Sequence, residues 1–148
     1  MDKIASFQIN HDTLVPGLYL SRADGNVYTY DLRFKRPNKG DYLKIAAMHT
    51  IEHLFATVVR NSAFKDKVVY FGPMGCRTGF YLLLFDVDDL IIAKQIVVES
   101  LKLCLELEKI PGAKKIECGN YRSHSLKEAK KEIESYLDVL NASGTNKK

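Results

Sequence analysis

Strand-type and helix-type segments follow one another along this chain without regular strand–helix–strand alternation. Segments rich in apolar, β-branched and aromatic residues predict strands at 27–34, 68–71 and 80–85. Helical patterns occur at 43–61, 90–108 and 125–140. This order favours an α+β fold, in which an antiparallel sheet packs against helices in a layered sandwich.

The remaining segments are expected to be short and irregular. Residues 1–25 are interrupted by Pro16, Gly17 and Asp24, and residues 116–121 are expected to be briefly extended. A length of 148 residues suits one compact domain, and no repeat or Pro/Gly/Ser-rich linker divides the chain. We therefore expect residues 1–148 to form a single domain.

Charge and hydropathy exclude several classes of partner. The net charge is only +4, and no basic stripe with interleaved aromatic residues is present, so we expect no binding to nucleic acid. No apolar run reaches the length of a membrane span, and the N-terminus lacks the pattern of a signal peptide. We therefore expect a cytoplasmic protein. Three cysteines in a reducing compartment are expected to be free thiols or metal ligands.

The segment 49–53 is the most informative for function. His49 and His53 are four residues apart, so on a helix they project from one face and can reach the same metal ion. Glu52 borders that face and is placed to move a proton. The same order of residues occurs in inverted zinc metallopeptidases, so a metallopeptidase is one alternative function. A second alternative is that the two histidines are ordinary surface residues that bind no metal. Either Cys118 or His124 can supply a third ligand.

The number of ligands separates an enzyme from a non-enzymatic metal-binding or scaffold protein. Cys118 precedes a glycine, where the backbone can approach closely, and a His–His–Cys set leaves one metal position open for catalysis. A closed site with His124 as fourth ligand would instead indicate a non-enzymatic metal-binding protein. Both Zn²⁺ and Fe²⁺ suit these donors.

A second cysteine lies in the glycine-rich segment 72–79, between two predicted strands. The flanking glycines permit close approach of a substrate to Cys76, and the adjacent Arg77 favours its reactive thiolate. The alternative is an inert, buried thiol. Cys104, among the leucines of a predicted helix, is expected to fill the core.

Taken together, these motifs resemble the S-ribosylhomocysteine lyase (LuxS) family over nearly the whole chain. The resemblance is carried by residues 6–7, 10–12, 30–34, 37–38, 49–54, 73–81 and 117–119. It implies metal ligands at His49, His53 and Cys118 and an acid/base pair at Glu52 and Cys76. It also implies one divalent metal per subunit. Fe²⁺ is the metal expected in vivo, and Zn²⁺ and Co²⁺ are alternatives.

The resemblance further implies a homodimer with its active sites at the interface. The implied substrate contacts are Ser6, His11, Arg33 and Arg60, with Ser6 and His11 contributed by the neighbouring chain. Tyr70 departs from the family pattern, in which an acidic residue often lies six positions before the loop cysteine. If that acid holds the substrate amino group, this chain must hold it differently.

The implied reaction cleaves S-ribosylhomocysteine into homocysteine and 4,5-dihydroxy-2,3-pentanedione, the precursor of autoinducer-2 in quorum sensing. Two carbonyl migrations along the sugar make the C4 proton acidic, and its removal expels homocysteine by β-elimination. A metal acts as Lewis acid on the sugar oxygens, and Cys76 and Glu52 exchange protons. Use of the product as a signal and simple recycling of homocysteine in the methyl cycle stay open.

Overall fold

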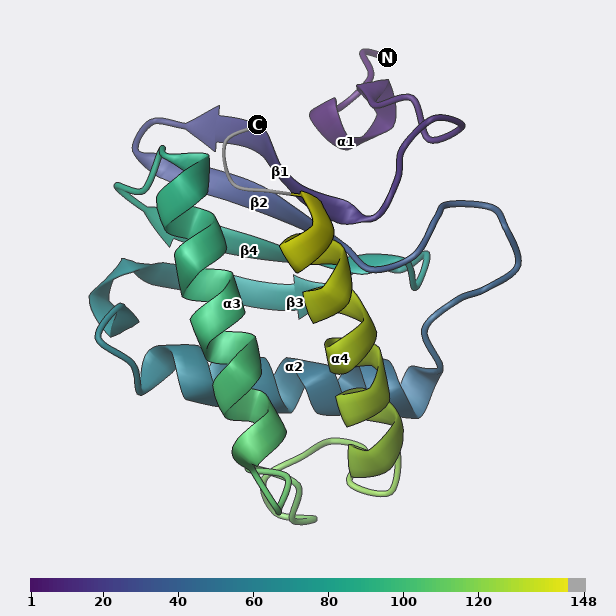
Figure 1. Ribbon diagram of the computed structural model, residues 1–148, viewed down its shortest axis with the longest axis vertical. Coiled ribbons are helices and arrows are strands. Elements are labelled where there is room, and N and C mark those ends of the chain that lie inside the picture. Colours follow the sequence, from purple (N-terminus) through teal and green to yellow (C-terminus); the bar gives the residue numbers. More distant parts are fainter. Residues whose placement is uncertain (144–148) are drawn as a thin grey trace.

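The computed structural model describes residues 1–143, which contain a four-stranded antiparallel sheet (Figure 1). The strand order is β1-β2-β4-β3. The strands are β1 (Gly17–Asp24), β2 (Val27–Arg33), β3 (Val68–Pro73) and β4 (Gly79–Phe85). Each pair of neighbouring strands is antiparallel. The prediction of an α+β fold with an antiparallel sheet is therefore confirmed.

Helices pack against this sheet. They are the short α1 (Ala5–Gln8), α2 (Ile45–Arg60), α3 (Leu90–Glu106) and α4 (Leu126–Ser143), with a 3₁₀ turn at Lys65–Lys67. In Figure 1, α3 and α4 cross in front of the sheet, while α2 lies along the edge formed by β3. The Asp89 carboxylate caps the start of α3 by accepting a hydrogen bond from the Ile91 N–H at 2.8 Å.

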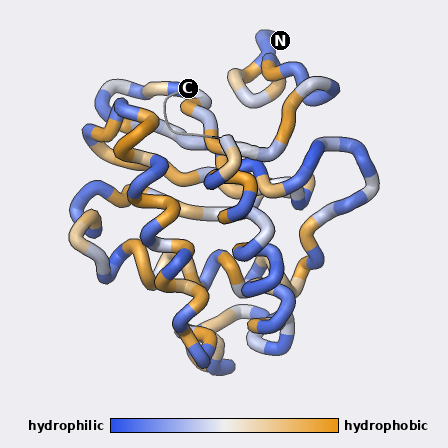
Figure 2. The backbone as a smooth tube through the Cα atoms, viewed as in Figure 1, coloured by the Kyte–Doolittle hydropathy of each residue, from blue (hydrophilic) through white to orange (hydrophobic). Residues whose placement is uncertain are grey.

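Strand alternation separates the two faces of the sheet. On β4, Phe80, Leu82 and Leu84 are buried against the helices, while Tyr81 and Leu83 point to the opposite face. In Figure 2, apolar and polar positions alternate along α3, as an amphipathic helix over a core requires, whereas residues 34–44 are mainly hydrophilic.

Two local predictions differ from the structure. Residues 17–24 form strand β1, which was expected to be irregular. Residues 116–121 were expected to be extended, and this is wrong, because they form turns in which Glu117 N and Cys118 N both donate to Lys114 O. None of the helices within residues 1–143 is long and apolar enough to cross a membrane.

Cys104 lies fully buried on α3, which confirms that it fills the core. Burial raises the pKa of its thiol to about 12, from the ordinary 9.0. Because the unfolded chain loses this proton at a lower pH than the folded protein, the associated stability is lost as the pH rises above about 9.

We therefore expect Cys104→Ala to have a flatter pH dependence of stability than the wild type. Between pH 9 and pH 10, the free energy of unfolding of the wild type should fall by about 1 kcal/mol more than that of the variant. Urea unfolding at pH 7, 9 and 10 measures this difference. Parallel pH profiles for the two proteins would contradict it.

Candidate metal centre

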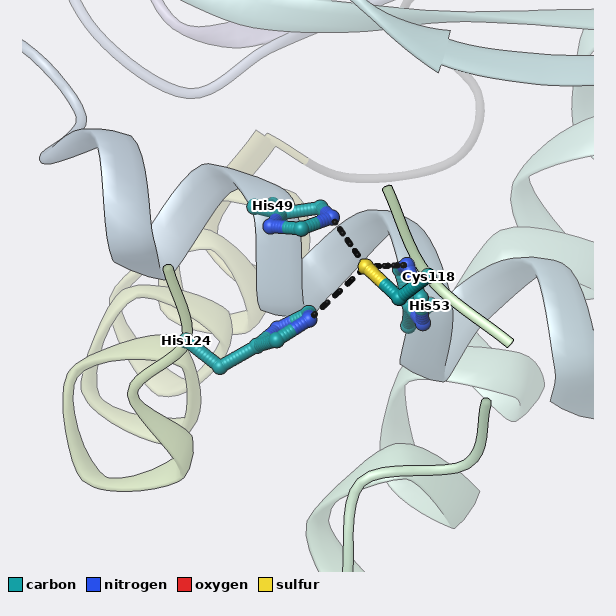
Figure 3. Close-up of side chains that lie close together, drawn as sticks. All are labelled: His49, His53, Cys118 and His124. Carbon is teal, nitrogen blue, oxygen red and sulfur yellow. Dashed lines mark hydrogen bonds between the residues drawn. The ribbon is translucent and has the colours of Figure 1, made fainter. Parts of the chain in front are cut away.

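Within residues 1–143, four potential metal ligands gather beside α2 (Figure 3). His49 and His53 project from the same side of α2, while Cys118 and His124 come from the segment between α3 and α4. The Cys118 Sγ atom lies 3.5 Å from His49 Nε2, 3.9 Å from His53 Nε2 and 3.7 Å from His124 Nε2. All the donor atoms lie within 4.8 Å of one another.

These separations fit one divalent ion at the centre of the group. In a tetrahedral zinc site, bonds of about 2.3 Å to sulfur and about 2.0–2.1 Å to nitrogen place the two ligand atoms about 3.5 Å apart. The S–N separations here run from 3.5 to 3.9 Å. Imidazole nitrogen and thiolate sulfur are also suitable donors for zinc, iron and cobalt. The group is therefore a candidate mononuclear metal site.

Outer hydrogen bonds orient the two histidines of α2 for metal binding. His49 Nδ1 lies 2.7 Å from Ser123 O, and His53 Nδ1 lies 2.9 Å from Pro111 O. A carbonyl oxygen only accepts, so each Nδ1 carries the proton and donates it. Each Nε2 is therefore left with its lone pair directed at the group, as in metal-ligating histidines generally.

His124 has a different environment. Its Nδ1 lies 2.9 Å from the Thr50 hydroxyl. That hydroxyl accepts a hydrogen bond from Ser125 N, just before α4. A hydroxyl can donate or accept, so this contact does not fix the His124 tautomer as a carbonyl would. Burial, together with the charges of His49 and His53, lowers the pKa of His124 to about 4. His124 is therefore neutral near pH 7, which is the form that binds metals.

The turn at Pro111–Gly112 lets the chain approach the site closely. Gly112 has φ +69°, and a Cβ there would lie 3.3 Å from His53 Nδ1. Glu52, His53 and Gly112 line an open hollow of about 300 Å³, to which Phe71 also contributes. The prediction that Glu52 borders the metal-binding face of the helix is consistent with this arrangement.

Cys76 lies at the end of a chain of side chains on the opposite face of the sheet. Its exposed Sγ is 3.1 Å from Thr78 Oγ1, which accepts from Arg33 Nη1 at 2.7 Å. Arg33 Nη2 donates to Asp31 Oδ2 at 2.5 Å. Burial raises the pKa of Asp31, and the hydrogen bond and charge of Arg33 act against that rise.

The loop that carries Cys76 is attached to the segment that leads into α2. Leu43 N donates to Arg77 O at 2.9 Å, and Arg77 Nη1 donates to Leu43 O at 3.3 Å. In Figure 1 this loop, between β3 and β4, lies at the same end of the sheet as the start of α2. The loop of Cys76 is therefore attached two residues before the start of α2, the helix that carries His49 and His53.

Three of the four predicted substrate contacts lie around Asp31 and Tyr81, which pair on β2 and β4. Tyr81 forms a hydrogen bond with Ser6, and the Arg33 charge opposes the rise that burial causes in the pKa of Tyr81. The charge of His11 acts against the rise that burial causes in the pKa of Asp31. Ser6, on α1, lines a hollow of about 310 Å³ with Tyr70 and Tyr81. His11 Nδ1 donates to Ile9 O at 2.9 Å. Arg33 is 1% exposed.

Arg60, the fourth predicted contact, ends α2 and donates to Val69 O at 3.1 Å. It lies eleven residues after His49 on the helix, or about 16 Å along the helix axis. Within this chain, the structure therefore places Arg60 apart from the candidate metal ligands.

The fold and the site together define an α+β protein with a candidate mononuclear metal site built on a His-x-x-Glu-His helix. A family model described as S-ribosylhomocysteinase (LuxS) matches residues 4–147. The chain belongs to the LuxS family, which confirms the resemblance seen in its motifs.

Curated relatives extend over almost the full length of this chain. It is 49% identical to the S-ribosylhomocysteine lyase of Borreliella afzelii (strain PKo), with 95% of this chain and 94% of the relative covered. It is 47% identical to the enzyme of the same name in Clostridium beijerinckii (95% and 92%) and 44% identical to that of Finegoldia magna (95% and 93%). These names give no support to the metallopeptidase alternative.

Proposed function

We propose that this chain is a carbon–sulfur lyase that cleaves S-ribosylhomocysteine to homocysteine and 4,5-dihydroxy-2,3-pentanedione. The observation that carries the proposal is the convergence of His49 Nε2, His53 Nε2 and Cys118 Sγ on one point in a chain of the LuxS family. The names of the relatives supply the substrate.

The substrate determines what the site must do. A thioether sulfur leaves a saturated carbon slowly unless the proton on the neighbouring carbon is acidic. The carbonyl of the sugar must therefore move from C1 to C2 and then to C3, after which loss of the C4 proton expels homocysteine from C5. A divalent metal held by His49, His53 and Cys118 would supply Lewis acidity to the sugar oxygens.

Glu52 and Cys76 are assigned the proton transfers between sugar carbons. Each carbonyl migration removes a proton from one carbon and returns one to its neighbour, so the site needs groups that both accept and donate protons. Glu52 lies on the helix that carries His49 and His53, and Cys76 lies on an exposed loop joined to the start of that helix. Proton transfer by such groups contributes about 10²–10⁴-fold to the rate.

When a metal is bound, His124 would be the donor among the four that gives way most easily to a substrate oxygen. His49 and His53 each donate to a carbonyl oxygen, which fixes the tautomer. His124 contacts a hydroxyl, which can form a hydrogen bond with either tautomer. A site closed permanently by His124 would leave no position for substrate. Replacement of His124 by a substrate oxygen would therefore allow a group of four donors to serve a catalytic metal.

We also propose that residues 1–148 form one domain of a cytoplasmic homodimer with one metal per subunit, Fe²⁺ in vivo. Ser6 and His11 are proposed to reach the substrate of the neighbouring subunit, and Arg33 and Arg60 stay predicted substrate contacts. Support comes from the hollow beside Ser6, on the sheet face opposite α3 and α4. Sedimentation of the metal-loaded protein tests the dimer, and a monomer at micromolar concentration would contradict it.

Cys76→Ala and Glu52→Gln test the assignment of the proton carriers. We expect each variant to keep its metal and to release thiol from S-ribosylhomocysteine at least about 10²-fold more slowly than the wild type. Cys104→Ala is the matched control, because it removes a buried thiol outside the site and should retain activity. Full activity of metal-loaded Cys76→Ala would overturn the role of the thiol.

A further inference from the structure

Hydrogen bonds link a chain of side chains from Asp31 through Arg33 and Thr78 to Cys76. Arg33 can only donate, so Thr78 Oγ1 must accept from Arg33 Nη1 at 2.7 Å. The Thr78 hydroxyl has a single proton, and Cys76 Sγ is 3.1 Å away. While Cys76 is a thiol either atom can donate, but an ionised sulfur can only accept, and the Thr78 proton is then directed at it.

We infer that Thr78 is a positioning residue that holds Cys76 as an oriented thiolate. A hydrogen bond donated to sulfur stabilises the charged form more than the neutral thiol. The buried guanidinium of Arg33 polarises the hydroxyl that donates it, so Arg33 acts on Cys76 through Thr78. Only the proton-transfer role of this thiolate rests on the proposed function.

The backbone around Thr78 fixes the hydroxyl in place. Thr78 is 1% exposed, and its carbonyl accepts from both Phe34 N and Lys35 N, at 2.8 and 2.9 Å. The next residue, Gly79, pairs with Arg33, and a Cβ there would lie 2.3 Å from Leu32 O. This close backbone approach aligns Thr78 with the Arg33 side chain.

The turn before Thr78 aims Cys76 at the same hydroxyl. Arg77 adopts φ 62°, a left-handed conformation that is uncommon for a residue with a side chain, and Arg77 N donates to Met74 O at 3.0 Å. This turn brings Cys76 back towards Thr78, two residues further on. The sheet thus fixes the hydroxyl and the turn fixes the sulfur.

A purely structural role for Thr78 predicts something different. If the hydroxyl served only to accept from buried Arg33, its removal would lower stability and leave the reactivity of Cys76 unchanged. If it donates to the sulfur, its removal must also slow the reaction of Cys76 with an alkylating agent. The rate of thiol alkylation separates the two roles, because only the thiolate reacts.

The experiment compares Thr78→Val and Thr78→Ser in the metal-loaded, full-length protein. Alkylation of Cys76 by iodoacetamide is followed by mass spectrometry between pH 5 and pH 10, with Cys76→Ala as the blank for the other thiols. We expect Thr78→Val to slow the alkylation of Cys76 near neutral pH roughly tenfold relative to the wild type. Thr78→Ser should keep the wild-type profile.

Thr78→Ala serves the same purpose if Thr78→Val does not fold, because it removes the hydroxyl without placing a methyl group against Arg33. A wild-type profile in either folded variant would overturn the inference. Alkylation requires no turnover, so the result is independent of lyase activity. Absence of thiol release from the wild type would overturn the proposed function while leaving this measurement interpretable.

Discussion

Replacing Cys118 by alanine is expected to remove the metal from the protein and to abolish thiol release. Cys118 is the only sulfur donor in the candidate site, and its thiolate would be the only anionic ligand in a group that otherwise contains neutral imidazoles. Loss of an outer-shell partner alone typically weakens metal binding about 10–100-fold. Loss of a direct ligand should exceed that, so dialysis against a weak chelator should strip Cys118→Ala and spare the wild type.

His124→Ala is the matched control, since it removes a donor from the same loop at a similar distance. If His124 yields its position to substrate, the three remaining ligands should retain one metal per chain. Metal content after dialysis measures retention, and the visible spectrum of the Co²⁺ form reports a change of ligands. A Cys118→Ala protein that keeps a full metal complement would contradict the assignment of this ligand.

Asp31→Ala is expected to lower the free energy of unfolding by about 3–5 kcal/mol, the usual cost of removing one partner from a buried ion pair. Asp31 and Arg33 are each 1% exposed, and the variant would leave the guanidinium buried without its carboxylate. Within residues 1–143 the pair is already imperfectly satisfied, because Asp31 Oδ1 and Arg33 Nε have no hydrogen-bond partner.

Two comparisons isolate the effect of burial. Asp24→Ala breaks the Arg22–Asp24 ion pair, whose side chains are 49% and 55% exposed, and should change the free energy of unfolding little, because solvent screens an exposed pair. The double variant Asp31→Ala/Arg33→Met removes both charges and should regain much of the stability lost in the single variant. Urea unfolding at one fixed protein concentration measures all of these variants. A cost for Asp31→Ala as small as that for Asp24→Ala would contradict the argument.

The sequence predicts the long regular elements because their patterns are local. The helix at 43–61 has apolar residues at helical spacing, and the structure places α2 at Ile45–Arg60. Strand β1 was not recognised because Pro16 and Gly17 indicate a break and because the register shifts between Leu20 and Arg22. That irregularity interrupts the inside–outside alternation on which recognition of a strand depends.

The segment before α4 was wrongly predicted because its apolar residue is not buried. Ile116 is 94% exposed, in a run of turns that brings Cys118 back to α2. Spacing along the sequence left Cys118 and His124 as competing ligands, whereas the structure gathers both. The segment that carries them is hydrogen-bonded to α2 through Ser125 N and the Thr50 hydroxyl, 75 residues apart, and no local pattern contains such a contact.

The side chains that support Cys76 were also outside the reach of local patterns. Asp31 and Arg33 are two residues apart on a strand and therefore share a face, but an arginine on a strand is usually a surface residue. Two opposite charges on one face of an otherwise uncharged strand are a signal for a buried ion pair. The role of Thr78 required knowledge of the pairing between Gly79 and Arg33.

Anaerobic turnover of S-ribosylhomocysteine by the Fe²⁺-loaded wild-type protein tests the central claim most directly. Free thiol is followed during the reaction, and the dicarbonyl product is trapped with a diamine and quantified. We expect equal amounts of homocysteine and 4,5-dihydroxy-2,3-pentanedione, formed only by metal-loaded protein. No thiol release from a fully metallated wild-type protein would contradict the assignment of this chain as a lyase.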